Sequence, residues 1–166
     1  MDWNLVMNII LGGALVTLGG MGILGLKQWV ERKSLKKVDP QLTSAIVPLS
    51  LMAVIYFVFD KIIVLNTRPN GSGESSFPST HVMVVATVFF IVMIGLLPEY
   101  IKSKKMRVAL DLVMVGLIVL TCVGRVLANM HWVSDVIGGV GFAVGFAVIY
   151  GLILRKMERA RRLEQK

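Results

Sequence analysis

The sequence predicts an all-α integral membrane protein, a bundle of about five transmembrane helices in a single domain over residues 1–166. Composition is the first reason, because 55% of the residues are hydrophobic and 17% are charged, which is more apolar than a soluble domain of this length requires. The second reason is that apolar residues gather into runs near the ~20 residues that a bilayer-spanning helix needs. These runs cover residues 3–26, 43–65, 80–97, 108–126 and 132–154.

The flanks of the runs support each predicted helix. The first run follows MDWN, which has no basic segment and no clear cleavage site, so we expect a retained helix and not a signal peptide. The second run has Pro48 near its start, where a helix tolerates proline. Pro78 and Ser79 predict the start of the third run. A soluble bundle of buried helices is the alternative, and the lengths of the five runs disfavour it.

The basic residues predict the orientation in the membrane. Of the 18 lysines and arginines, 15 lie in the segments 27–39, 98–107 and 155–166, which five spans place on one side. The positive-inside rule makes that side cytoplasmic, with the N-terminus outside and the C-terminus inside. The net charge of +8 is typical of proteins that contact nucleic acid or anionic lipid. Its distribution favours anionic lipid headgroups at the cytoplasmic face and no nucleic acid.

Five other charged or titratable residues map to the opposite, outer side. They are Lys61, Arg68 and Arg125 and the two histidines of the chain, His81 and His131. Charges at membrane ends that oppose the topological trend are candidates for function. Snorkelling explains any one of them alone, but five on one face predict a site.

The segment GRVLANMHWVSD, residues 124–135, contains the most informative spacing. His131 and Asp135 are four residues apart, so they share one face if both are helical. Asp135 could then fix one imidazole nitrogen and leave the other free to attack, which is the logic of a catalytic triad. Arg125 precedes them, and a guanidinium can hold two phosphate oxygens at once.

Two further segments supply complementary groups. In KIIVLNTRP, residues 61–69, proline turns the chain away from the helix at Arg68. In FPSTH, residues 77–81, the free amides of a helix N-terminus favour an anion, and His81 lies in the first turn. Cations and amides suit a phosphate, and two histidines suit a nucleophile and a general acid. A metal site is the alternative for two histidines and an aspartate, but three nearby cations would repel a metal ion.

These three segments resemble the motifs of the type 2 phosphatidic acid phosphatase superfamily, the integral-membrane lipid phosphatases. The family motifs are KxxxxxxRP, PSGH and SRxxxxxHxxxD. They correspond here to residues 61–69, 78–81 and 124–135, in the same order and without gaps. Two positions depart from the pattern: Thr80 replaces the glycine of PSGH, and Gly124 replaces the serine before the arginine. We count five spans where the family typically has six, so self-association into a homo-oligomer is an alternative to a chain that works alone.

The resemblance implies a role for each matching residue. His131 would be the nucleophile that forms a phosphohistidine, Asp135 would orient it, and His81 would protonate the leaving oxygen and then activate water. No metal or other cofactor is implied. The implied substrate-binding residues are Lys61, Arg68, Pro69, Ser79, Thr80 and Arg125.

We therefore expect a phosphatase of lipid phosphates or diphosphates at the extracytoplasmic face of the cell membrane. Undecaprenyl diphosphate is the expected substrate, with phosphatidic acid, phosphatidylglycerophosphate and a lipid A phosphate as alternatives. A lipid phosphotransferase would use the same catalytic residues and remains open. A non-enzymatic scaffold or lipid-binding relative would be expected to lack a catalytic residue, and His81, His131 and Asp135 are all present.

Overall fold

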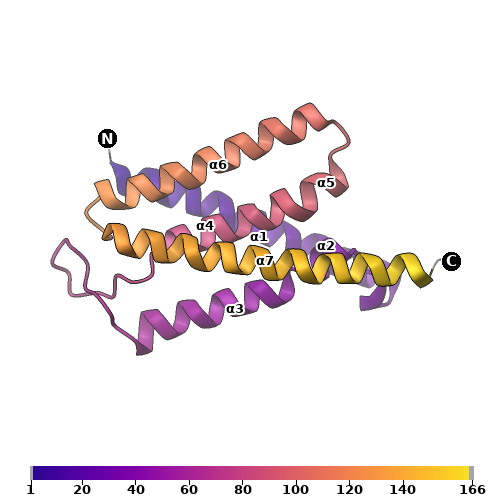
Figure 1. Ribbon diagram of the computed structural model, residues 1–166, viewed down its shortest axis with the longest axis horizontal. Helices are drawn as coiled ribbons and strands as arrows, with labels where there is room; N and C mark the ends of the chain where they lie inside the picture. The colour runs from indigo at the N-terminus through magenta and orange to yellow at the C-terminus, as the bar shows by residue number, and fades with distance from the viewer. Residues whose placement is uncertain (1, 165–166) are drawn as a thin grey trace.

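The computed structural model describes residues 2–164, which are mostly helical. Long helices run side by side, and the connections gather at the two ends of the bundle (Figure 1). The elements are α1 (Trp3–Arg32), the 3-10 turn η1 (Leu35–Lys37), α2 (Pro40–Thr43), α3 (Ile46–Phe57), the π-helical turn η2 (Val58–Ile62), α4 (Thr80–Ile91), the π-helical turn η3 (Val92–Leu96), α5 (Leu97–Tyr100), α6 (Lys104–Leu127) and α7 (Val133–Glu164).

The predicted all-α membrane bundle is confirmed. Within the described residues, five helical stretches are long and apolar enough to cross a membrane. They are Trp3–Arg32, Pro40–Ile62, Thr80–Tyr100, Lys104–Leu127 and Val133–Leu163. The largest shift in bounds is at the C-terminal end, where the predicted run stops at residue 154 and α7 continues to Glu164. The extension is rich in arginine and lysine, which favour helix even where no apolar face is needed.

Local capping explains where several helices begin and end. The Asp2 carboxylate accepts a hydrogen bond from the Leu5 amide at 3.2 Å, and the Ser103 hydroxyl accepts one from the Met106 amide at 3.4 Å. Both are N-cap contacts that satisfy an otherwise free amide. Lys33 ends α1 in the left-handed conformation, with φ 54°.

The centre of the bundle is α4. Of the 18-residue apolar stretch in this span, 67% is buried, against 11% in the corresponding stretches of α1 and α6. One cluster of buried side chains joins α4 to α1, α6 and α7 and includes Met7, Ala14, Val85, Ile118 and Ala143. The outer sides of α1 and α6 are exposed within the molecule, as expected for helices surrounded by hydrocarbon.

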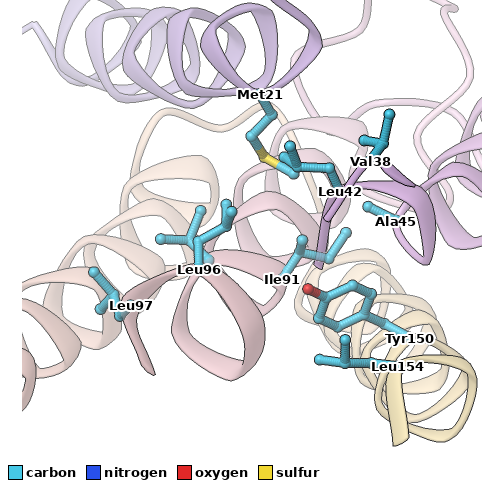
Figure 2. Packing of buried hydrophobic residues seen from close by; sticks show 10 residues of the cluster. Met21, Val38, Leu42, Ala45, Ile91, Leu96, Leu97, Tyr150 and Leu154 are labelled. Atoms are coloured by element: carbon cyan, nitrogen blue, oxygen red, sulfur yellow. The ribbon is translucent and has the colours of Figure 1, made fainter. Parts of the chain in front are cut away.

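A second cluster of buried side chains packs α1, α4 and α7 together toward the C-terminal end of α7. Figure 2 shows Tyr150 reaching in from α7 toward Ile91, with Leu154 beside it. The Tyr150 hydroxyl donates to the Gln41 carbonyl at 3.0 Å, which satisfies the one polar group of a fully buried side chain. Gly95 makes this possible, because a side chain there would collide with the Tyr150 hydroxyl.

Candidate active site

The loop before α4 folds back on itself at the end of the bundle opposite the C-terminus (Figure 1). Thr67 and Ser75 form an isolated antiparallel bridge, and the Ser76 amide donates to the Asn66 carbonyl at 2.8 Å. Gly71 and Gly73 have φ of 77° and 74°, a left-handed conformation that glycine adopts at little cost. Residues 66–76 therefore form a short hairpin, which returns the chain to α7.

The turn between α6 and α7 places the second part of the site. The Met130 amide donates to the Arg125 carbonyl at 3.2 Å, which closes the turn after the last residues of α6. Asn129 takes φ 54° there, and asparagine tolerates this conformation better than most residues. The turn brings His131 back beside Arg125.

The start of α7 holds the hairpin. The Asp135 carboxylate accepts from the Trp132 amide at 2.8 Å, which is the reciprocal half of a capping box. The Asp135 carbonyl accepts from the Ser79 amide at 2.9 Å, so α4 begins against α7. Gly139 permits the approach, because a Cβ there would lie 2.8 Å from the Ser79 carbonyl oxygen.

His131 is buried and held at both ring nitrogens. Its side chain is 2% exposed. Nδ1 donates to the Ser76 carbonyl at 2.8 Å, and Nε2 accepts from Nη2 of Arg125 at 3.1 Å. This network assigns the neutral tautomer with the proton on Nδ1, which leaves the lone pair of Nε2 toward the guanidinium.

Asp135 lies farther from His131 than the spacing predicts. α7 begins at Val133, so His131 lies in the preceding turn and the two residues do not share a helix face. The Asp135 carboxylate is 3.8 Å from Nδ1, beyond hydrogen-bond distance, and accepts instead from the Ser76 hydroxyl. Ser76 therefore stands between the two residues.

The two predicted arginines both enter the site, with different partners. Arg125 is 4% exposed, and its Nε has no hydrogen-bond partner among the described residues. Arg68 forms an ion pair with Glu74 at 2.8 Å and lines a cavity of about 10 Å³ with Thr80 and His131. A buried guanidinium with an unused N–H is a ready partner for an anion.

Lys61 is not brought into this cluster. Its ammonium lies 2.8 Å from the Asp60 carboxylate, and its side chain is 65% exposed. Asp60, and not Lys61, is among the residues that line the cavity beside His131. Pro69 is half-buried next to Arg68 in the hairpin.

The first turn of α4 contributes three polar side chains. The Ser79 hydroxyl is buried, without a hydrogen-bond partner within residues 2–164. Thr80 lines the cavity. Nε2 of His81 donates to the Asn8 side-chain oxygen at 3.0 Å. In the part of the chain that the structure describes, no three His, Cys, Asp or Glu side chains gather as metal ligands do.

Burial and the positive charge of Arg125 lower the pKa of His131 from 6.5 to about 4. Both effects disfavour the imidazolium. The ring is therefore neutral near pH 7, and a neutral imidazole is the form that can attack an electrophile.

Sequence reasoning missed Ser76 and the contribution of α1. Ser76 lies outside the three motifs, and its main contact uses a backbone carbonyl, which no side-chain pattern reveals. From α1, Asn8 contacts His81, and Met7 packs on Gly124, where a Cβ would lie 2.5 Å from the Met7 sulfur. Gly124 thus leaves room for the end of the Met7 side chain.

Fold and site together define a multi-pass membrane protein in which arginine and histidine side chains gather at one end of the bundle, an arrangement suited to an anionic group. The sequence matches the family model described as PAP2 superfamily over residues 29–160. The chain belongs to the PAP2 superfamily, which confirms the resemblance found in its motifs.

A solved structure supports the fold. The transmembrane PAP2-type phosphatidylglycerolphosphate phosphatase from Bacillus subtilis superimposes with a TM-score of 0.59 at 21% sequence identity. The match covers 96% of this chain and 79% of that chain. No curated protein matches the sequence of this chain. The chain thus has the fold of a membrane lipid phosphatase of this superfamily.

Proposed function

We propose that this protein hydrolyses a lipid phosphate or diphosphate through a phosphohistidine on His131, without a metal ion, at the extracytoplasmic face of the cell membrane. One observation carries the proposal: Arg125 is buried, has an N–H without a partner among residues 2–164, and donates to Nε2 of His131 at 3.1 Å. A phosphate bound to this guanidinium would lie next to the nucleophilic nitrogen.

The reaction has two steps. Arg125 turns its Nη2 from the ring to the phosphate, which frees Nε2 of His131 to attack phosphorus. The bond to the leaving oxygen breaks, and His81, which enters as the imidazolium, donates a proton to that oxygen and becomes neutral. Water then attacks the phosphohistidine while His81 takes its proton, which releases inorganic phosphate and restores neutral His131. The Nδ1 proton stays in place throughout, hydrogen-bonded to Ser76.

The charges and hydroxyls of the site are assigned to the phosphate oxygens. Arg125 and Arg68 bind them, which requires Arg68 to leave Glu74. The Ser79 hydroxyl adds a donor, since it is buried without a partner in the described chain. Lys61 would add positive charge from the rim only if it left Asp60. The two arginines stabilise the charge of the transition state without a metal ion.

The lipid part of the substrate has a surface to lie on. An apolar groove of about 400 Å³ follows α7 and is lined by Gly138, Gly141, Phe142, Gly145, Phe146 and Ile149. It begins about one helical turn after Asp135, so a hydrocarbon chain in the groove would leave its headgroup near the site. We propose undecaprenyl diphosphate as the substrate, because a carrier lipid that finishes its cycle outside the cell presents its diphosphate to this face.

The test is phosphate release by the detergent-purified protein in EDTA, with undecaprenyl diphosphate and phosphatidic acid in parallel. We expect release to persist in EDTA and His131→Ala to lower kcat on the order of 10³-fold or more. Ser72→Ala, at an exposed hairpin position that does not line the cavity beside His131, is the matched control and should retain the wild-type rate.

Each other outcome contradicts one part of the proposal. Release that EDTA abolishes would contradict the metal-independent mechanism. Faster release from phosphatidic acid would contradict the proposed substrate. No release from either lipid by folded protein, with phosphate transferred when an acceptor lipid is added, would identify a phosphotransferase.

A further inference from the structure

We infer that Ser76 is a positioning residue of the nucleophile: its carbonyl holds Nδ1 of His131, and its hydroxyl links that contact to Asp135. The inference rests on the proposed function for its catalytic meaning. Its structural part, the state of the His131 ring, can be measured without any substrate.

Ser76 uses both of its polar groups in this arrangement. Its carbonyl accepts from Nδ1 of His131 at 2.8 Å, and its hydroxyl donates to the Asp135 carboxylate. The residue is 1% exposed, so water does not compete for either contact. The Ser76 amide donates to the Asn66 carbonyl at 2.8 Å, which fixes the orientation of the backbone on its other side.

Asp135 is committed to contacts other than His131. Its carboxylate accepts from the Trp132 amide at 2.8 Å, and its carbonyl accepts from the Ser79 amide at 2.9 Å. The 3.8 Å separation from Nδ1 allows attraction to an imidazolium but no hydrogen bond. The carboxylate therefore anchors Ser76 and the start of α7, and Ser76 fixes the ring.

The arrangement has a consequence for the tautomer of His131. A proton held on Nδ1 by the Ser76 carbonyl leaves Nε2 with a lone pair, and Nε2 is the atom that contacts Arg125 at 3.1 Å. When phosphorylation of Nε2 makes the ring cationic, the same carbonyl accepts a stronger, charge-assisted hydrogen bond. Ser76 thus favours both the attacking ring and the intermediate.

The first test is nitrogen NMR of protein labelled with ¹⁵N-histidine. The chain contains two histidines, so His81→Asn assigns the spectrum. We expect His131 to carry its proton on Nδ1 in the wild-type protein near pH 7, and Ser76→Ala to shift part of the population to Nε2. A wild-type His131 protonated on Nε2 overturns the inference, whether or not the protein is active.

The second test is a double-mutant cycle with Ser76→Ala and Asp135→Asn. We expect Ser76→Ala to lower kcat on the order of 10-fold, with KM nearly unchanged, because it misplaces the nucleophile without touching the phosphate. If Asp135 acts through Ser76, the double variant should be little slower than Asp135→Asn alone. Effects that multiply, or a Ser76→Ala enzyme with wild-type kcat, overturn the inference.

The two tests separate the failure of this inference from failure of the proposed function. Protein that releases no phosphate but shows the Nδ1 tautomer, sensitive to Ser76→Ala, keeps the positioning role and refutes the hydrolase. Active protein in which the His131 signal does not respond to Ser76→Ala keeps the proposed hydrolase and refutes the positioning role. Ser72→Ala in the same hairpin is the control for both tests, and thermal unfolding checks that Ser76→Ala is folded.

Discussion

The imidazole of His131 is fixed by one neighbour at each nitrogen, the Ser76 carbonyl and the Arg125 guanidinium. Each contact selects the neutral ring in a single tautomer. This is a strong constraint for one side chain, because both the proton count and the proton position are set before a ligand arrives.

The pH dependence of kcat/KM should reflect this constraint. The pKa of His131 is lowered to about 4 by burial and by Arg125, so the attacking form persists well below pH 6.5. We expect the acid limb of kcat/KM, which reports the free enzyme, to lie clearly below pH 6.5. Stability should fall as the pH drops from 6.5 toward 4, because in that range the unfolded chain binds a proton that the folded chain excludes.

A pH series of kcat/KM, paired with thermal unfolding at each pH, measures both effects. An acid limb centred at pH 6.5 would show that His131 titrates as a free histidine and would contradict its burial.

For single residues, the sequence predicted which side chains form the site better than it predicted their contacts. The motif spacing identified Arg68, Arg125 and both histidines as candidates, and the structure brings these four side chains to one end of the bundle. The spacing of His131 and Asp135 predicted a hydrogen bond on one helix face, but α7 begins at Val133, and the two groups lie 3.8 Å apart with Ser76 bonded to both. A carbonyl acceptor such as that of Ser76 carries no side-chain signature, so it could not be predicted.

At the scale of elements, the site depends on the close approach of α4 and α7. Gly139 faces the backbone of the α4 N-terminus, where a Cβ would lie 2.8 Å from the Ser79 carbonyl oxygen. Backbone atoms cannot move aside cheaply, unlike the end of a flexible side chain. The N-terminus of α4, with Ser79 and His81, can therefore lie this close to α7 because residue 139 has no Cβ.

We expect Gly139→Ala to destabilise the fold by about 1–3 kcal/mol through overpacking, and to lower kcat. Gly151 lies on the same helix outside the proposed lipid groove, and nothing in the described chain lies within 4 Å of the position that a methyl group would take there. Gly151→Ala should be neutral or slightly stabilising, since alanine favours helix by up to about 1 kcal/mol over glycine. Thermal unfolding and phosphate release measure the pair, and equal effects of the two substitutions would contradict the packing argument.

The existence of the helices was predictable, and their contacts were not. Apolar run lengths predicted five spans because the bilayer imposes one length on every crossing segment. The same runs are apolar nearly all round, so they carry little information about which face meets which neighbour. The packing of Met7 on Gly124 and the contact of Asn8 with His81 depend on such facing, and neither could be read from a single helix.

At the scale of the whole molecule, the distribution of charge predicts which end faces the cytoplasm. The exposed hairpin residue Ser72 and the exposed Lys102 lie in loops that five spans place on opposite sides. The packing of the helices and the geometry of the site would be the same in either orientation, so the orientation needs its own experiment.

We expect Ser72→Cys to react with a membrane-impermeant maleimide in intact cells, and Lys102→Cys to react only after permeabilisation. Both substitutions are made in a Cys122→Ala background, which removes the one native thiol. Labelling of Lys102→Cys in intact cells, with Ser72→Cys protected, would place the His131 end in the cytoplasm.

Under the proposed function, the polar contacts of the site would also select among membrane lipids. Arg68 is paired with the Glu74 carboxylate and Arg125 donates to the neutral His131 ring, so an incoming headgroup must displace both contacts. A zwitterionic headgroup offers them little more than the partners they would leave, whereas a phosphate monoester offers up to two negative charges and several acceptor oxygens. Abundant structural lipids would then pass the site without occupying it, and a scarce phosphorylated lipid would not have to compete with the bulk of the membrane.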